Sequence, residues 1–409
     1  MSTTTFPNSA FETAQAKQGQ ASATGAVAGA TVRDPRLDFF RGLAMFIILI
    51  AHTPGNYLTL WIPARFGFSD ATEIFVFCSG MASAIAFGKV FETRGWWLGT
   101  ARVAYRVWQV YWAHICMFFV IAMLMAALDA SGLFTKNYIA SLNLKHFFFK
   151  DTAAQLVGLF TLTYVPNYFD ILPMYLAILA MMPIVVALKR VHPAAAFGAI
   201  GLVWLAANLN VLQLPAEPWS KREWFFNPFG WQLVFFTGFA FMRGWIPAPP
   251  VNRNLVIAAA VIVVLTIPVA WFRARGWDDS GVLKMIYKDV SGLRNKTDFG
   301  IFRYIHFLAV GYLAWVSVGE AGHRLIATGN NLRSAIWDRT VAIIQKVGQQ
   351  SLAVFLMSMV MGRVLGVMLD VIGRSWSSVF VVNLFGFAVL IATAYLVAWF
   401  KSQPWRKRA

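Results

Sequence analysis

The chain has 409 residues, of which 58% are hydrophobic and only 13% are charged, and its mean hydropathy is +0.60. These values indicate a polytopic membrane protein and exclude a water-soluble globular domain. The net charge of +17 does not indicate nucleic-acid binding, because Lys and Arg occur in short clusters between apolar runs. The two cysteines, Cys78 and Cys116, both fall in predicted spans, which argues against a disulfide framework and a metal site.

The two ends of the chain differ in composition from the apolar segments between them. Residues 1–35 are rich in Ser, Thr, Ala, Gly and Gln, and such a segment cannot bury enough apolar surface to offset its ordering entropy. We therefore expect a disordered cytoplasmic N-terminal tail. We expect no cleaved signal peptide, because the segment has no basic start followed by an apolar run. Residues 402–409 are expected to form a basic cytoplasmic C-terminal tail.

The first apolar helix carries three ionisable side chains that matter most: Asp38, Arg41 and His52. Arg41 and His52 are about three helical turns apart, so their side chains lie on one helix face roughly 16 Å from each other. Asp38 falls on the same face. Ionisable groups inside a bilayer are costly, and by default they mark a functional site. We therefore expect this face to point toward a polar interior.

Ten apolar segments are long enough to cross a bilayer, if one span takes about 20 residues. An even number of spans puts both termini on the same side. Lys and Arg are concentrated in the segments on that side, which is the positive-inside pattern and predicts cytoplasmic termini. The predicted fold is an all-α polytopic membrane protein with about ten transmembrane helices. The expected spans are roughly 37–60, 70–89, 102–128, 168–188, 193–212, 229–246, 254–272, 302–320, 350–372 and 379–400.

Two of the outer connections are long, and loops of such length are usually functional or mobile. Residues 129–167 include an aromatic, amphipathic stretch that lies along the interface or re-enters the membrane as a half-helix. Residues 273–301 mix basic and acidic groups. Aromatic faces with paired polar side chains suit a sugar polymer. Interfacial anchoring by aromatics and solvated charge explains both segments equally well.

Glu73 lies early in the second span, on the same outer side of the membrane as His52. A carboxylate near a histidine fixes its tautomer and stabilises the imidazolium form. We expect His52 to act as an acid and a base; the alternative is a structural hydrogen bond between helices. Glu73 is a candidate partner for His52, and Asp70 and Asp170 are two others.

Arginines supply the candidate anion-binding groups. Arg102 and Arg106 are one helical turn apart at the predicted cytoplasmic mouth of the third span, where two guanidinium groups can bind a phosphate in fork geometry or extend to lipid phosphates. Arg363 lies inside a predicted span, so its charge needs a partner or an anionic ligand. Arg303 and His306, near the outer start of the eighth span, are candidates for the same pocket.

A series of motifs in this order resembles the membrane-bound acyltransferase-3 superfamily: Arg36-Leu-Asp-Phe-Phe-Arg41-Gly with His52, Asp70-Ala-Thr-Glu-Ile-Phe-Val-Phe-Cys-Ser-Gly80, and the Arg102-x-x-x-Arg106 pair. More closely, residues 33 to about 400 are similar to the OpgC-type proteins, through His52-Thr-Pro-Gly-Asn56, Tyr111-Trp-Ala-His114, Asn167-Tyr-Phe-Asp170-Ile-Leu-Pro-Met-Tyr and Asn227-Pro-Phe-Gly-Trp-Gln. Cys78 departs from the pattern of the superfamily, which has Leu at that position.

This resemblance implies a multi-pass enzyme of the bacterial inner membrane, with residues 36–401 as a membrane acyltransferase domain. Such enzymes take an acyl group from cytoplasmic acyl-coenzyme A and place it on an extracytoplasmic sugar hydroxyl; the OpgC type succinylates osmoregulated periplasmic glucans. The expected partners are succinyl-coenzyme A as donor, a glucan acceptor, anionic membrane lipid and other glucan biosynthesis proteins. Neither a permanently bound cofactor nor nucleic acid is expected. His52 would be the catalytic histidine, and Arg41, Arg102 and Arg106 would bind the donor.

The resulting hypothesis is direct transfer across the membrane. His52 removes a proton from a glucose hydroxyl as that oxygen attacks the thioester, while Glu73 or Asp70 stabilises the imidazolium. A covalent acyl-histidine is left open. The free carboxylate of succinate needs a cation, for which Arg363 and Arg303 are the candidates. The expected substrate-binding residues are Asp38, Asp70, Asp170, Arg303, His306 and Arg363.

Two other classes of function remain. A proton-coupled transporter or flippase for an anionic or lipid-linked sugar would use His52 and Glu73 as a proton relay. Such a transporter has no need of the cytoplasmic pair Arg102 and Arg106. A scaffold without chemistry of its own predicts that His52→Ala is silent.

Overall fold

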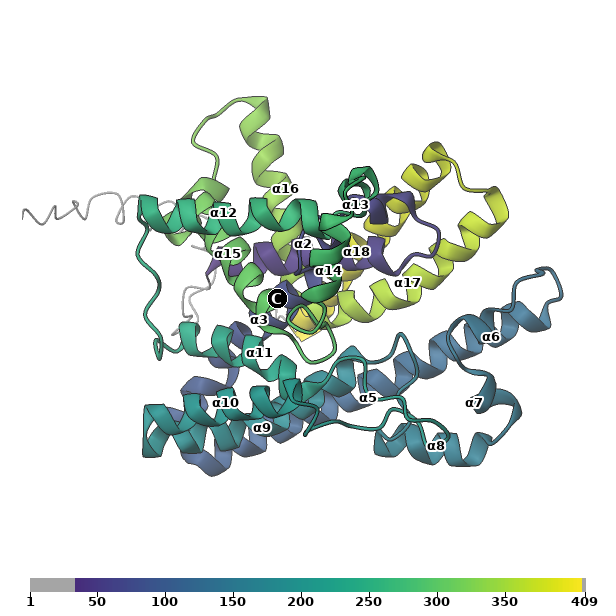
Figure 1. The fold of residues 1–409 in the computed structure, drawn as a ribbon, viewed down its shortest axis with the longest axis horizontal. Coiled ribbons are helices and arrows are strands. Elements are labelled where there is room, and N and C mark those ends of the chain that lie inside the picture. The colour runs from purple at the N-terminus through teal and green to yellow at the C-terminus, as the bar shows by residue number, and fades with distance from the viewer. Residues whose placement is uncertain (1–33, 407–409) are drawn as a thin grey trace, which may run out of the picture. The chain divides into compact units, whose positions relative to one another are not determined.

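A computed structural model describes residues 34–406 (Figure 1). The predicted N-terminal tail lies outside these residues except for its last two positions, and so do residues 407–409 of the predicted C-terminal tail. Within the described part of the chain all the regular structure is helical, apart from one isolated bridge between Pro215 and Glu223. The all-α fold class is therefore confirmed.

Seven helices of the described residues are long and apolar enough to cross a membrane. All ten predicted segments form helices, but three fall short of this standard. Two of them are short, α10 (Pro193–Asn208) and α11 (Pro228–Met242), and α2 (Pro35–His52) carries Arg36, Asp38 and Arg41 along its first two turns. The seven are α3 with η3 and α4 (Ala71–Thr93), α5 (Gly95–Ala130), α9 (Ile171–Val191), α12 (Arg253–Ala270), α15 (Ile301–Val318), α17 (Ser351–Ile372) and α18 (Trp376–Ser402) with its continuation to Arg406.

The connections contain more helix than the apolar pattern predicts. The two long connections, residues 129–167 and 273–301, fold into short helices, and an amphipathic helix, α16 (Leu332–Gln349), lies between α15 and α17. Hydropathy could not find it, because charged residues interrupt its apolar positions. The other elements are η1 (Tyr57–Leu60), η2 (Pro63–Arg65), α3 (Ala71–Ser83), η3 (Ala84–Gly88), α4 (Lys89–Thr93), α6 (Tyr138–Ser141), α7 (Lys145–Phe149), α8 (Thr152–Thr161), α13 (Phe272–Trp277), α14 (Val282–Asp289), η4 (Glu320–Leu325) and η5 (Pro404–Arg406).

Helix α2 ends at His52, eight residues before the predicted end of that span at residue 60. Pro54 cannot donate a backbone hydrogen bond, and Gly55 adopts a left-handed φ of +76°. The chain therefore leaves the helix directly after His52. As a result the imidazole stands at a helix terminus beside irregular backbone, rather than in the middle of a continuous span.

Helix α2 is held by α16, α17 and α3, which pack around it. Its contact with α16 is so close that a Cβ on Gly42 would lie 2.0 Å from the carbonyl oxygen of Ile344, and one on Gly348 would lie 1.8 Å from that of Asp38. Only glycine permits such a backbone approach. These two glycines therefore fix the depth of α16 against the first turns of α2.

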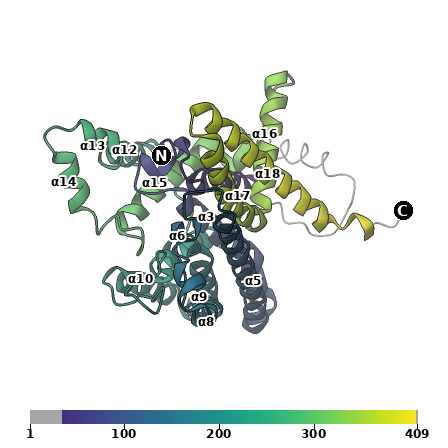
Figure 2. The same ribbon diagram turned by 90° about the vertical axis from the view of Figure 1, so that its right-hand side faces the viewer.

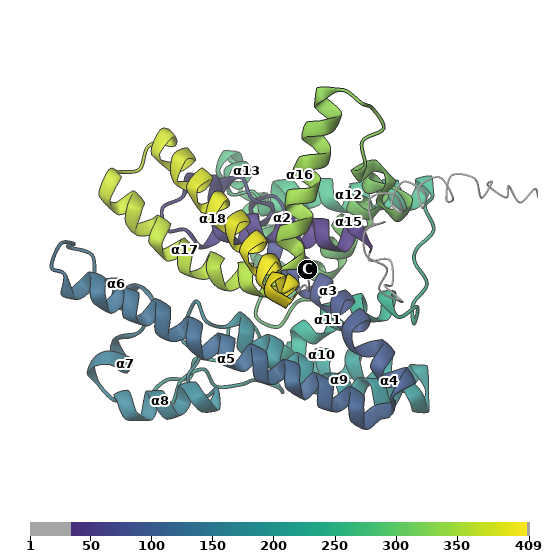
Figure 3. The same cartoon turned by 180° about the vertical axis from the view of Figure 1, so that it is seen from behind.

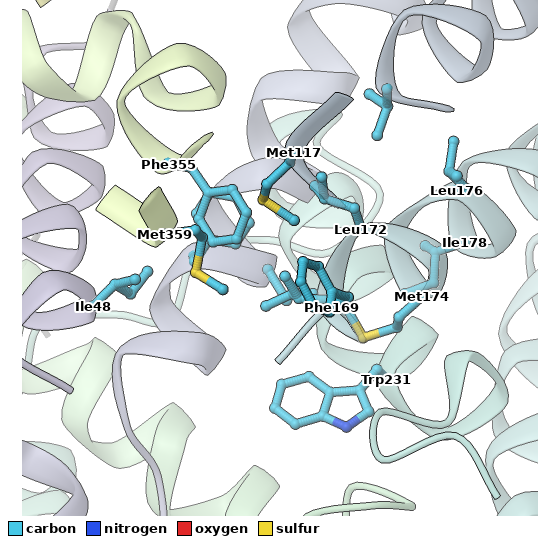
Figure 4. Close-up of a cluster of buried hydrophobic side chains, with 14 of the residues drawn as sticks. Ile48, Met117, Phe169, Leu172, Met174, Leu176, Ile178, Trp231, Phe355 and Met359 are labelled. Carbon is cyan, nitrogen blue, oxygen red and sulfur yellow. The ribbon is translucent and has the colours of Figure 1, made fainter. Parts of the chain in front are cut away.

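One apolar cluster joins most of these helices. α5 and α9 run side by side (Figures 1 and 3), and α17 pairs with α18 (Figure 2). The close-up in Figure 4 shows buried side chains of this cluster, among them Ile48 of α2, Met117 of α5, Met174 of α9, Trp231 of α11 and Met359 of α17. Ile48 precedes His52 by one helical turn, so the shared core also sets the position of the histidine.

Candidate functional site

His52 has a defined tautomer. Its Nδ1 lies 2.8 Å from the carbonyl oxygen of Ile48 in the preceding turn. A carbonyl oxygen only accepts hydrogen bonds, so Nδ1 must carry the proton and donate it. The neutral ring then presents Nε2 as a lone-pair acceptor, and no described residue hydrogen-bonds to that atom. This is the state that a general base requires.

Tyr168 lies next to His52, and the ring centroids are 5.3 Å apart in an edge-on arrangement. The guanidinium carbon of Arg363 stands 3.7 Å from the Tyr168 ring centroid, which is a cation–π contact. The Tyr168 hydroxyl donates a hydrogen bond of 2.5 Å to the Met359 carbonyl. Its φ of +87° is unusual for a bulky residue, and such outliers concentrate at functional sites. Tyr168, His52 and Arg363 are hereafter the imidazole cluster.

The imidazole cluster depends on a close approach of α17 to the end of α2. A Cβ on Gly362 would lie 2.8 Å from the His52 carbonyl oxygen and 3.1 Å from the Tyr168 hydroxyl. The next residue, Arg363, is half-buried, and its Nε is buried without a hydrogen bond from the described residues. No described carboxylate forms an ion pair with Arg363. The guanidinium is thus held by an aromatic face, with its charge uncompensated.

Glu73 belongs to a separate cluster at the start of α3. It completes a capping box, in which its carboxylate accepts a 2.7 Å hydrogen bond from the backbone N–H of Asp70. The same carboxylate accepts hydrogen bonds of 2.8 and 2.5 Å from Nε and Nη2 of Arg303. Both side chains are buried. Described donors therefore surround Glu73, and His52 is not among them.

Asp70 links this capping box to the second long connection. Its carboxylate lies 2.6 Å from Nζ of Lys296 and 3.5 Å from Nη2 of Arg303. Burial alone would raise the pKa of Asp70, but these two cations outweigh burial and hold it well below its ordinary value. The residues Asp70, Glu73, Lys296 and Arg303 form the ion-pair cluster. It secures residues 273–301 to the start of α3.

The ion-pair cluster borders the imidazole cluster. The charges of Arg363, Lys296 and Asp70 are all near enough to act on the His52 ring. His306 lies beside the ion-pair cluster, where its Nδ1 accepts hydrogen bonds from the hydroxyl (2.7 Å) and backbone N–H (3.3 Å) of Ser69. Its Nε2 is buried with no described partner. The predicted residues His52, Asp70, Glu73, Arg303, His306 and Arg363 are therefore gathered in one region.

Asp170 is the residue before α9, two positions after Tyr168. Its carboxyl is buried, and Oδ1 has no hydrogen-bond partner among the described residues. Burial raises the pKa of Asp170 to about 7, although the nearby charge of Arg222 opposes the rise. A carboxyl that is protonated below about pH 7 and partly unpaired suits hydrogen bonding to an uncharged polar ligand, such as a sugar hydroxyl.

The three predicted donor-binding arginines come from two helices. Arg41 on α2 donates to the hydroxyl of Ser351, and Asp38 is buried three residues before it. Arg102 and Arg106 lie on α5, where Arg102 is exposed and Arg106 donates a 3.1 Å hydrogen bond to Gln109 of the same helix. No described contact joins this α5 pair to the imidazole cluster or the ion-pair cluster.

Sequence reasoning missed Tyr168 as a site residue. It stands in the Asn167-Tyr-Phe-Asp170 motif, but its role depends on a positive φ and on contacts with α2 and α17, neither of which leaves a local signal. Among residues 34–406 no group of three His, Cys, Asp or Glu side chains is arranged to hold a metal ion.

Comparison with known proteins found one family match. The family described as OpgC protein matches residues 33–402, which is nearly the whole chain. No curated protein matches the chain, and no solved structure does either.

Proposed function

Because this chain belongs to the OpgC protein family, we propose that it transfers a succinyl group from cytoplasmic succinyl-coenzyme A onto glucose hydroxyls of osmoregulated periplasmic glucans, with His52 as general base. The family implies a transferase role in the modification of osmoregulated periplasmic glucans. Seven apolar helices of spanning length indicate a membrane protein. The proposal adds the donor, the acyl group, the inner membrane, a place in the acyltransferase-3 superfamily and the catalytic residue.

The observation that carries the proposal is the tautomer of His52. With the proton on Nδ1 and directed to Ile48, Nε2 can take the proton of a sugar hydroxyl as its oxygen attacks the thioester carbonyl carbon. The carbon–sulfur bond then breaks, and the leaving thiolate takes the proton from the imidazolium. Atoms and charges balance in this single acyl transfer, which needs no acyl-enzyme intermediate.

The Ile48 carbonyl occupies the position that we expected a carboxylate to fill. At 2.8 Å it accepts a hydrogen bond from Nδ1–H and so stabilises the imidazolium, as a backbone carbonyl does for many functional histidines. Glu73 is already engaged by Arg303 and by the Asp70 backbone. We therefore propose that Glu73 holds the ion-pair cluster together. The negative charge of Asp70 is proposed to act on His52 from a longer range.

The two candidate cations for the succinyl carboxylate differ in their partners. Arg303 is compensated by Glu73 at 2.5 Å and Asp70 at 3.5 Å. Arg363 has no ion pair with a described carboxylate and is held beside His52 by the Tyr168 ring. A partly buried, uncompensated guanidinium favours an anionic ligand. We therefore propose Arg363 as the group that binds the succinyl carboxylate, while His306 and Arg303 support the pocket from the neighbouring cluster.

The residues proposed to bind the donor and the acceptor are also assigned from the hydrogen-bonding groups that they have available. The exposed Arg102 and the half-buried Arg106, with Arg41, are proposed to hold the phosphates of the donor. Asp170, with its free carboxyl oxygen, is proposed to hydrogen-bond the glucan acceptor. Asp38 is proposed to support Arg41 from the preceding turn of α2.

The proposal is tested by coenzyme A release from purified protein in detergent, with succinyl- or acetyl-coenzyme A and with or without glucan. We expect release that depends on glucan and prefers the succinyl donor. Arg363→Met should reduce succinyl transfer far more than acetyl transfer, whereas Arg94→Met, which removes an exposed arginine elsewhere, should change neither. Equal loss of both activities would refute the role of Arg363. A folded protein that releases no coenzyme A with any donor would favour the transporter.

A further inference from the structure

Residues 319–350 connect two candidate spans, α15 and α17, and contain no candidate span themselves. Both ends of this segment therefore lie at the same membrane face, and η4 and α16 lie between them. The second half of α16 is packed against the first turns of α2 through Gly42 and Gly348. The connection is thus fixed at one end and lies close to the membrane surface.

Within residues 34–406 nothing covers the apolar side chains in the first half of α16. Leu332 is 76% exposed, Ile336 58% and Trp337 44%. Leu332 and Ile336 are one helical turn apart, so they lie on the same face. Large apolar side chains exposed together on a surface helix indicate contact with a membrane or another apolar surface.

Beside this face is an open hollow of about 440 Å³, formed by the end of η4, the residues after it and the first turns of α16. Two arginines and a histidine line it, and none of its lining residues is acidic. The Trp337 indole donates a 3.2 Å hydrogen bond to the Leu325 carbonyl, which fixes its ring at the edge of the hollow. The lining residues are His323, Arg324, Ile326, Ala327, Thr328, Arg333, Ser334 and Trp337.

The two arginines are available to a ligand. Arg324 donates one hydrogen bond of 3.3 Å, to the Ser317 carbonyl, which leaves most of its guanidinium donors unused. Arg333 makes no hydrogen bond or ion pair with a described residue. Two guanidinium groups with hydroxyls of Thr328 and Ser334 nearby suit a phosphate group.

We propose that this hollow binds the phosphate headgroup of an anionic phospholipid, while Leu332 and Ile336 enter the hydrocarbon beside it. Basic groups next to exposed apolar side chains, on a segment between two spans, match the charge and polarity of a membrane surface. A free phosphate or a nucleotide phosphate would use the same arginines, but it would leave the apolar face uncovered. The lipid accounts for both features.

Lipid binding here would act on the site through α2. The bound headgroup holds α16 from one end, and α16 contacts α2 at Gly42, next to Arg41. Anionic lipid should therefore stabilise the folded protein whether or not a donor or a glucan is present. This effect does not depend on the proposed acyl transfer.

The test measures thermal stability and bound lipid, by native mass spectrometry, for the full chain in phosphatidylcholine nanodiscs with or without phosphatidylglycerol. We expect phosphatidylglycerol to stabilise the wild type. Arg324→Gln/Arg333→Gln should weaken its binding by roughly thirtyfold, the effect of two basic groups near a membrane surface. Arg324→Lys/Arg333→Lys should restore most of the binding.

A matched control removes two positive charges of α16 that do not line the hollow, Arg339→Gln/Lys346→Gln, and should retain the wild-type response. An equal loss in this control would overturn the proposal, because only general charge would then matter. Retention of binding in Arg324→Gln/Arg333→Gln would overturn it as well. So would release of the bound lipid by inorganic phosphate or by adenosine 3′,5′-bisphosphate, since the hollow would then prefer a soluble phosphate.

Discussion

The Tyr168 ring stands edge-on to the His52 imidazole, with the centroids 5.3 Å apart. The same Tyr168 ring also forms a cation–π contact with the guanidinium of Arg363, whose central carbon lies 3.7 Å from the ring centroid. The Tyr168 ring therefore contacts both the candidate base and the cation and keeps both at one site. Without it, the guanidinium could move toward His52 and disfavour the imidazolium that forms when the base takes a proton.

Tyr168→Ala should reduce succinyl transfer by about thirtyfold, because it removes a cation–π contact worth about 2 kcal/mol when desolvated. Tyr168→Phe keeps the ring and loses only the hydrogen bond to Met359, so its effect should be severalfold smaller. Both rates are measured as glucan-dependent coenzyme A release at saturating donor. Equal losses in the two variants would show that the hydroxyl, not the ring face, matters.

Gly362→Ala should impair both stability and activity. The new methyl group would lie 2.8 Å from the His52 carbonyl oxygen, and overpacking of this kind typically costs about 1–3 kcal/mol. Thermal unfolding and the transferase rate report the two effects. Gly311→Ala is the matched control in α15, since nothing lies within 4 Å of the added atom. If both variants behaved as the wild type, the close approach of α17 to His52 would be wrong.

Glu73→Gln should lower the stability of the folded protein rather than act directly on catalysis. It leaves the buried Arg303 with a weaker acceptor, and breaking a buried ion pair costs about 3–5 kcal/mol. Adding Arg303→Gln should recover part of the loss, because it removes a buried charge that only the longer 3.5 Å contact with Asp70 then compensates. Thermal unfolding of the wild type, Glu73→Gln and Glu73→Gln/Arg303→Gln tests this coupling. A Glu73→Gln protein of unchanged stability but greatly reduced turnover would instead assign Glu73 to the chemistry of His52.

Asp170 should make the stability of the protein depend on pH. Burial raises its pKa from the ordinary 3.8 to about 7 in the folded state. Between these values the unfolded chain has released the proton that the folded chain still binds, so the free energy of unfolding falls as the pH rises. Asp170→Asn lacks this proton. Its free energy of unfolding relative to wild type should therefore increase from pH 4 to 7 and level off above pH 7. If the free energies of unfolding of the two proteins changed in parallel with pH, the raised pKa of Asp170 would be contradicted.

Hydropathy predicted the position of each long apolar helix among the described residues, because a bilayer span needs a continuous apolar run that the sequence displays directly. It overestimated the length of α2, since the local break at Pro54 and Gly55 outweighs the apolar residues after it. It also missed α16, whose apolar positions alternate with charged residues. Helix ends depend on single residues and on packing, and neither appears in an average over a window.

The sequence indicated which residues belong to the candidate site, but not which of them contact each other. Charges within apolar segments identified His52, Glu73, Arg303 and Arg363, because burying a charge needs a reason. Which charges meet depends on how distant helices pack, so the expected pair of His52 with Glu73 gave way to Glu73 with Arg303. The role of Tyr168 came from a positive φ, which no spacing of residues reveals.

The most direct test of the account counts succinyl esters on the glucan by mass spectrometry, together with coenzyme A released, for the wild type and His52→Ala. We predict one ester for each coenzyme A released by the wild type, and a loss of about a hundredfold or more in His52→Ala, as expected for removal of a general base. A correctly folded His52→Ala protein that esterifies the glucan at the wild-type rate would contradict the assignment of His52 as the base.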